Sequence, residues 1–185
     1  SIAHAVHVDA ADITTLAATG TGVVHNPVSN MRVGSGIAPI VAMRDAGVNL
    51  AIGTDGAASN DGQHFFEALK AAMYLQRLTM APQPRWMSAR EGLRVAANRD
   101  AFGLGAGRVE IGLPADLIAL SAASYALTPA NDWHRQIVYG APDLEVRYAM
   151  VDGRLLLDDG RITSFDEAAV LTEARSIGAS LFGGR

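Results

Sequence analysis

Three short apolar segments alternate with two helical segments at the start of the chain. Each apolar segment contains, or is followed by, a histidine or aspartate that could bind a metal or transfer a proton. Strands are predicted at 1–8, 23–25 and 48–54, and helices at 9–19 and 38–46. Short connections of this kind require parallel strands with helical crossovers, which place the carboxyl ends of all the strands on one side. We therefore expect His4, His25 and Asp55 to converge on one face of an α/β sheet.

Asp55 is the most informative of these three residues. The apolar run 50–52 stops at Gly53, and small turn-forming residues surround the carboxylate that follows. A carboxylate at the carboxyl end of a buried strand can ligate a metal and exchange a proton with the metal-bound water. An equally valid interpretation of the local pattern alone is that Asp55 caps a turn, as Asp often does beside Gly.

The composition narrows the class of protein. With 185 residues, 49% of them hydrophobic, the chain is expected to fold around a sizeable core. A net charge of -4, with Lys70 as the single lysine and no basic run, argues against nucleic-acid binding. Without cysteine, any metal must be held by His and carboxylates. Neither an apolar run of roughly 20 residues nor a basic-then-apolar start is present, so we expect a cytoplasmic protein without membrane spans.

The second half of the chain changes character. Helices are predicted at 64–79 and 89–102, the latter with a capping box formed by Ser88 and Glu91, and residues 26–30 are predicted as a loop. A glycine-rich stretch at 103–112 then leads to short strands and a hairpin turned by Asp152 and Gly153. An Ala-rich helix is predicted at 165–182.

Three ordered motifs resemble the amidohydrolase superfamily, in particular its branch of aminohydrolases and chlorohydrolases acting on purines, pyrimidines and triazines. Segments 3–8 (AHAVHV), 24–39 (VHNPVSNM followed by GSGIAP) and 53–60 (GTDGAASN) look like the ends of barrel strands six, seven and eight. Segments 107–117 and 150–154 are similar to those with which these enzymes enter a small β-sandwich after the barrel.

This resemblance implies an α/β fold that is the C-terminal part of a (β/α)8 metal-dependent hydrolase barrel. The implied parts are strands six to eight with their helices (1–104), part of a small β-sandwich (105–164) and a C-terminal helix (165–185). It also implies a small heteroaromatic substrate and a Zn²⁺ or Fe²⁺ ion in the complete enzyme. Such an ion supplies hydroxide at neutral pH by lowering the pKa of water to about 7.

The resemblance assigns roles position by position. Asp55 matches the acidic metal ligand that shuttles a proton between the water and the leaving group. His4 matches the strand-six histidine that orients the water and the substrate. Ser59 lies where related enzymes contact the heteroaromatic ring, and His25 and Asn30, together with Ser29, lie on a loop near the pocket as further candidates for substrate binding.

One departure from the family pattern affects the metal. In these enzymes the metal is held chiefly by a His-x-His pair on strand one and a His on strand five, and this chain has no His-x-His pair. Because a catalytic metal needs about three protein ligands, we expect this chain to bind metal poorly and to be inactive on its own. Three barrel strands without their partners would also expose sheet edges, which favours self-association into a homo-oligomer.

Two other functions remain open from the sequence. The chain could act as a non-catalytic binding or assembly module built on the same fold. It could also be an unrelated α/β enzyme that holds a phosphate at the turn from Gly53 to Gly56, which predicts an anion bound there beside a helix N-terminus.

Overall fold

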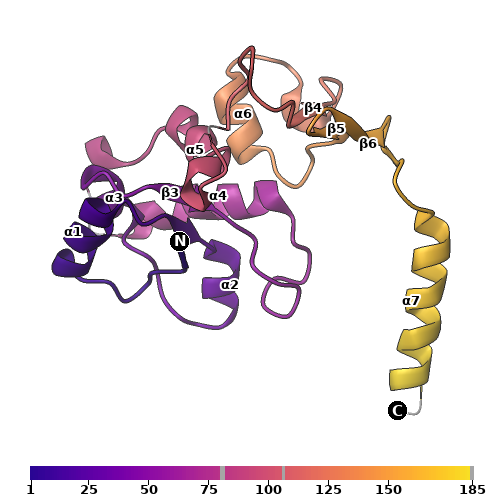
Figure 1. Cartoon of the computed structure of the whole chain (residues 1–185), viewed down its shortest axis with the longest axis horizontal. Coiled ribbons are helices and arrows are strands. Elements are labelled where there is room, and N and C mark those ends of the chain that lie inside the picture. Colours follow the sequence, from indigo (N-terminus) through magenta and orange to yellow (C-terminus); the bar gives the residue numbers. More distant parts are fainter. Residues whose placement is uncertain (80–81, 106, 184–185) are drawn as a thin grey trace. The chain divides into compact units, whose positions relative to one another are not determined.

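A computed structural model describes residues 1–79, 82–105 and 107–183, which form two compact units (Figure 1). The first unit comprises Ser1–Arg108 and Ala122–Leu144, and the second comprises Val109–Ser121 and Glu145–Arg185. Residues 122–144, which lie inside the range predicted for the β-sandwich, thus belong to the first unit. The predicted domain boundaries of the complete protein stay a prediction.

The first unit is built on a three-stranded parallel sheet. Its strands are β1 (Ile2–Ala3), β2 (Val23–His25) and β3 (Leu50–Ile52), in the order β1-β2-β3. Both strand pairs are parallel, with Ile2 opposite Val23 and Val23 opposite Leu50. The sheet confirms the parallel arrangement that the alternation of elements predicts.

Two helices form the crossovers between these strands. In α1 (Ala10–Thr19), Asp9 caps the first turn and forms a capping box with Asp12, and Gly20 ends the helix in the left-handed conformation at φ 65°. The second crossover helix is α3 (Ile40–Asp45), which starts two residues later than predicted because Pro39 serves as its N-cap and not as part of its first turn.

The predicted loop at 26–30 is wrong. These residues lie largely in a short helix, α2 (Pro27–Arg32), which begins directly after β2 with Pro27 in its first turn. Proline is favoured there because the first turn needs no donor from its backbone nitrogen. Pro27 is compatible with a loop, but it is equally suited to start a helix.

Two further helices cover the sheet and supply much of the core. The predicted helix at 64–79 is present as α4 (Phe65–Leu75) followed by the 3-10 turn η1 (Gln76–Leu78), with His64 as the N-cap of α4. The chain then forms the 3-10 turn η2 (Gln83–Arg85), the helix α5 (Ala89–Ala96) and the 3-10 turn η3 (Arg99–Phe102). The predicted capping box of Ser88 and Glu91 is present at the start of α5. The buried apolar side chains of this core include Val23, Met43, Leu69, Ala72, Met73 and Val138.

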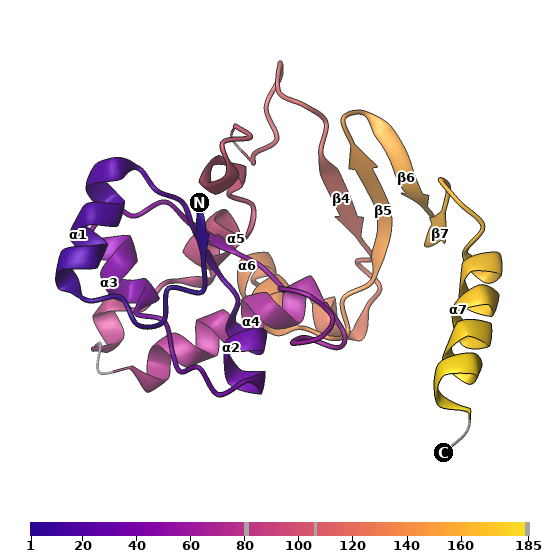
Figure 2. The same cartoon turned by 60° about the horizontal axis from the view of Figure 1, so that its bottom comes forward.

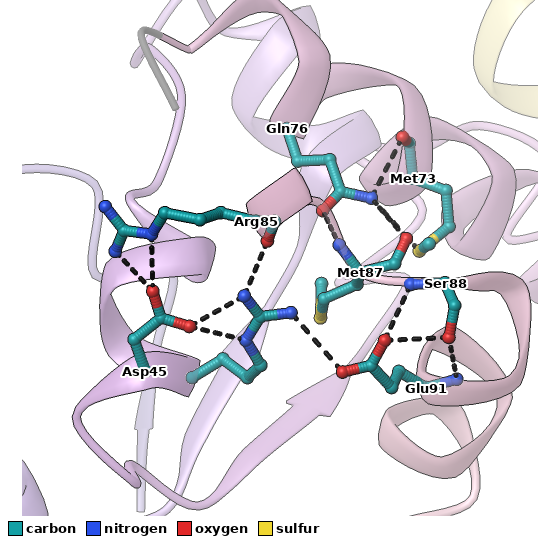
Figure 3. A network of polar contacts seen from close by, with 8 residues as sticks. Asp45, Met73, Gln76, Arg85, Met87, Ser88 and Glu91 are labelled. Atoms are coloured by element: carbon teal, nitrogen blue, oxygen red, sulfur yellow. Dashed lines mark hydrogen bonds and ion pairs between the residues drawn. The ribbon is translucent and has the colours of Figure 1, made fainter. Parts of the chain in front are cut away.

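A polar network connects these helices around the core (Figure 3). The amide of Gln76, 1% exposed, accepts from the backbone N–H of Met87 at 2.7 Å and donates to two carbonyl oxygens, so its burial is compensated. Nearby, Arg85 donates to Asp45 at 2.8 Å, and Arg44 binds both Asp45 and Glu91. The network fixes the start of α5 relative to α3 and α4.

Residues 122–144 add two elements that the sequence did not predict. They form the 3-10 turn η4 (Tyr125–Leu127) and α6 (Trp133–Tyr139), which Asp132 caps through the backbone N–H of Arg135. Val138 of α6 is fully buried, and Lys70 of α4 donates to the carbonyl oxygen of Ala141 at 2.6 Å. These contacts place α6 against α4.

The second unit consists of an antiparallel sheet and a helix (Figure 2). Its strands are β4 (Leu117–Leu120), β5 (Val146–Val151), β6 (Arg154–Asp158) and β7 (Arg161–Ile162), in that order. The predicted hairpin is present, with Asp152 and Gly153 at positive φ in its turn. The chain continues into α7 (Glu167–Phe182).

Among the described residues, no helix has both the length and the apolar character needed to cross a membrane.

Candidate active site

Two strand ends deliver His4 and Asp55 to one place. His4 follows β1 directly and hydrogen-bonds through its backbone N–H to the carbonyl oxygen of Val24 at 2.9 Å. Asp55 lies three residues beyond the end of β3. Both residues have a positive φ, 68° for His4 and 60° for Asp55, a region that non-glycine residues rarely occupy. Such backbone outliers cluster at functional sites, because surrounding contacts must hold them in place.

Three side chains face the same oxygen of the Asp55 carboxylate. The hydroxyls of Ser29 and Ser59 donate to Oδ2 at 2.6 and 2.8 Å. His4 Nε2 lies 3.7 Å from that oxygen. The side chains of His4 and Asp55 are 40% and 35% exposed, so the pair is accessible to a small molecule. The structure thus brings together His4, Asp55 and Ser59. Of the three residues expected to converge, His4 and Asp55 do so, from the ends of β1 and β3.

These hydrogen bonds keep Asp55 ionised. The hydroxyl of Ser29 lowers the pKa of the Asp55 carboxyl most, followed by that of Ser59 and the backbone N–H of Gly56. His4 adds a smaller effect in the same direction when its imidazole is protonated. A carboxylate that accepts several hydrogen bonds has its charged form favoured. At neutral pH Asp55 is therefore an anion, the form that binds a cation or takes up a proton.

His4 is oriented by Asn30. Its Nδ1 lies 2.7 Å from the amide oxygen of Asn30. An amide oxygen only accepts, so this assignment of the amide puts the proton of a neutral imidazole on Nδ1 and leaves the Nε2 lone pair facing Asp55. Asn30 is 1% exposed, so here its side chain holds the ring of His4. A substrate contact of Asn30 stays a prediction.

One short helix therefore positions both candidate catalytic groups. Ser29 and Asn30 are consecutive residues of α2, and one contacts Asp55 while the other contacts His4. The sequence offers one signal for this arrangement, Pro27, because a proline suits the first turn of a helix and so indicates that Ser29 and Asn30 can lie on one.

His25 occupies a different position from its two predicted companions. Its ring is 2% exposed, and it lines a small cavity with apolar residues of the core that include Ile40, Leu50 and Met87. Neither ring nitrogen has a hydrogen-bond partner among the described residues. Burial, with a smaller effect from His4, lowers the pKa of His25 to about 4. The structure does not place His25 beside Asp55, and its predicted role in substrate binding stays untested.

The loop after β3 is braced by residues that sequence reasoning did not select. The side-chain amide of Asn60 donates to the carbonyl oxygen of Thr54 at 2.8 Å, and that of Gln63 donates to the carbonyl oxygen of Asp55 at 3.0 Å. A Cβ at Gly53 would lie 2.4 Å from Oδ1 of Asn26 and 2.9 Å from Cγ1 of Val24, so any larger residue there would force these side chains to shift. These contacts hold the backbone on both sides of the carboxylate.

The donor set fits one ligand of a divalent metal and not a complete site. Asp55 is ionised and accessible, as a metal ligand must be. Among residues 1–79, 82–105 and 107–183, however, no group of three or more His, Cys, Asp or Glu side chains is arranged to hold a metal ion. A zinc site with about three protein ligands therefore needs donors other than those described.

Comparison with known proteins decides the family. The model of the amidohydrolase family matches residues 1–156, which is most of the chain. This chain belongs to the amidohydrolase family. The resemblance to the amidohydrolase superfamily is therefore confirmed.

Curated relatives of this amidohydrolase chain are deaminases. It is 41% identical over 174 residues to a 5-methylthioadenosine/S-adenosylhomocysteine deaminase of Halobacterium salinarum, covering 94% of this chain and 40% of that protein. It is 38% identical over 181 residues to a 5'-deoxyadenosine deaminase of Methanosarcina mazei, covering 97% of this chain and 42% of that protein. The chain thus spans about two-fifths of the length of these relatives.

Solved structures of the family have the same fold. A zinc-bound adenosine deaminase from Xanthomonas campestris superposes with a TM-score of 0.88 at 32% identity, over 95% of this chain and 41% of that one. The zinc complex of atrazine chlorohydrolase TrzN from Arthrobacter aurescens superposes with a TM-score of 0.86 at 29% identity, over 95% of this chain and 40% of that one. The mixed α/β architecture of this amidohydrolase chain is therefore that of hydrolases solved with zinc.

Proposed function

We propose that this amidohydrolase chain carries the proton-transferring half of a zinc-dependent deaminase that acts on an adenosine-like nucleoside. The observation that carries the proposal is the cluster at Asp55, where two serine hydroxyls hold the carboxylate and His4 Nε2 lies 3.7 Å from it. The names of the relatives, which refer to adenosine derivatives, support this substrate class over triazines. In this proposal, residues 1–104 form strands six to eight of a (β/α)8 barrel.

Asp55 is suited to move a proton twice. As an anion at neutral pH, it takes a proton from the attacking water. The protonated carboxyl then transfers that proton to the departing amine, so that ammonia leaves. The hydroxyls of Ser29 and Ser59 stabilise the charged carboxylate at the start and the end of this cycle.

His4 is suited to hold the water or the substrate beside Asp55. With its Nδ1 proton engaged by Asn30, its Nε2 accepts a hydrogen bond from a group that lies next to the carboxylate. The orientation of the ring is set before substrate arrives, so little entropy is lost when the hydrogen bond forms.

Asp55 is the residue of this chain that would hold zinc, together with donors outside the described residues. A zinc ion supplies a nucleophile at neutral pH by lowering the pKa of water. The alternative of a phosphate at the turn from Gly53 to Gly56 is disfavoured, because the anionic Asp55 at its centre would repel a phosphate.

The test is ammonia release by the complete product of the gene that encodes this chain, loaded with zinc. Substrates are 5'-methylthioadenosine, S-adenosylhomocysteine, 5'-deoxyadenosine and atrazine. Asp55→Asn is expected to lower kcat by about 10³-fold, within the range of general acid–base catalysis. The matched control is Asp61→Asn, which removes an acid of the same loop whose ion pair with Arg32 is exposed. Zinc-loaded protein without activity on any substrate would support the binding-module alternative instead.

A further inference from the structure

The first unit has a cavity that the proposed function does not use. Its volume is about 390 Å³, and it lies between η1, the start of α5 and the start of α6. Its charged and titratable lining residues are Arg77, Arg90, Asp132, His134, Arg135 and Tyr139. We propose that this cavity, called the arginine pocket below, binds a phosphate ester.

The arginine pocket carries excess positive charge. Among the described residues, none of its three arginines forms an ion pair with an acid. The only acid in its lining, Asp132, accepts from the backbone N–H of Arg135 at 3.2 Å and lies 3.8 Å from His134 Nδ1. The whole chain has a net charge of -4. Three guanidinium groups around one carboxylate, which is already engaged as a helix cap, nevertheless make this region locally positive and attractive to anions.

Arg77 is held in place before any ligand binds. Its guanidinium carbon lies 5.4, 5.5 and 5.4 Å from the ring centroids of Tyr74, Trp86 and Tyr139, and it donates to the hydroxyl of Tyr139 at 2.8 Å. Cation–π contacts attract the charge without neutralising it. Because these contacts already restrict the side chain, little conformational entropy remains to be lost when an anion binds.

The start of α5 adds to the positive potential of the arginine pocket. Ser88, Ala89 and Arg90 line the arginine pocket, so the positive end of the helix dipole lies beside it. Glu91, the acid of this first turn, is not among the lining residues, and its carboxylate is engaged by Ser88 and by Arg44 (Figure 3). The helix end therefore reinforces the three arginines without an acid in between.

The size and the lining favour an ester over the free ion. Guanidinium groups bind phosphate oxygens through paired hydrogen bonds, which makes arginine a preferred phosphate ligand. A volume of about 390 Å³ is within the range of small-molecule sites and exceeds what one inorganic phosphate fills. The ring of Tyr139 supplies apolar surface for the organic part of the ligand.

The test is isothermal titration calorimetry of the 185-residue chain at low ionic strength. The probes are inorganic phosphate, ribose 5-phosphate and ribose. Arg90→Gln and Arg135→Gln are each expected to weaken ribose 5-phosphate binding by about tenfold, the effect of losing one charge-assisted contact. The control is Arg94→Gln, which removes an exposed charge from the same helix outside the arginine pocket. Circular dichroism of each variant verifies that it is folded.

The proposal predicts saturable binding of ribose 5-phosphate, tighter than that of inorganic phosphate, and no binding of ribose. Absence of saturable binding by the wild-type chain would overturn it. An equal loss of affinity in Arg94→Gln would also overturn it, because binding would then follow overall charge. Equal affinity for phosphate and ribose 5-phosphate would refute the proposal that the ligand is an ester, and would indicate a site for the free phosphate ion. If Arg90→Gln or Arg135→Gln unfolds, Arg77→Lys at an exposed position decides instead. This substitution keeps the positive charge but loses the paired hydrogen bonds that a guanidinium group can donate to a phosphate.

Discussion

The buried imidazole of His25 should make the stability of the first unit fall with acidification. Its ring is 2% exposed, and burial lowers its pKa to about 4. In the unfolded chain, a histidine has a pKa of about 6.5. Between these two values the unfolded state binds a proton that the folded state does not, so stability is lost as the pH falls through this window. Below pH 4 both states are protonated and the loss is complete.

The size of this loss follows from the two pKa values. A difference of about 2.5 pKa units, at 1.36 kcal/mol each, gives about 3 kcal/mol in total and about 2.5 kcal/mol at pH 4.5. His25→Leu removes the titrating group and fills its place with an apolar side chain. Because both ring nitrogens lack partners among the described residues, this substitution should not lower stability at pH 7.5.

The assay is urea unfolding followed by tryptophan fluorescence at pH 7.5, 6.0, 5.0 and 4.5. Both tryptophans, Trp86 and Trp133, lie in the first unit, so the signal reports that unit alone. His7→Gln is the control, since His7 is exposed. The difference in unfolding free energy between His25→Leu and wild type should grow by about 2.5 kcal/mol from pH 7.5 to 4.5. A difference that stays constant with pH, or that His7→Gln reproduces, would refute the reasoning.

Three further substitutions test the packing and the site. Ser29→Ala removes the strongest hydrogen bond to Asp55 and should raise the pKa of that carboxyl, as measured by carbon NMR; an unchanged pKa contradicts the contact. Leu69→Ala empties a fully buried position and should lower the unfolding free energy by about 2–5 kcal/mol in urea titrations, whereas a loss below about 1 kcal/mol would place this side chain outside the core. Gly53→Ala puts a Cβ 2.4 Å from Oδ1 of Asn26 and should cost about 1–3 kcal/mol in the same titrations; a neutral effect would show that the two strand ends are farther apart.

The central geometry was predictable because it follows from connectivity. Short crossovers force parallel strands, and parallel strands bring their carboxyl ends together, which is why His4 and Asp55 were expected to meet. The capping box of Ser88 and Glu91 was predictable because it depends on two residues only three positions apart.

Other parts of the site could not be predicted because they depend on contacts between distant residues or on very short elements. The six residues of α2 are too few to show a helical period, so Ser29 and Asn30 were placed on a loop. The face to which His25 points could not be determined either, because a strand of three residues gives no clear alternation of polar and apolar positions. The seven-residue helix α6 was missed for the same reason.

The most direct test of the central claim is anomalous diffraction at the zinc edge from crystals of the complete gene product soaked with zinc. The account predicts one strong anomalous peak beside the carboxylate of Asp55, with the imidazole of His4 next to it. A zinc peak at another place in the protein, with the side chains of Asp55 and His4 at opposite ends of the sheet, would contradict the account.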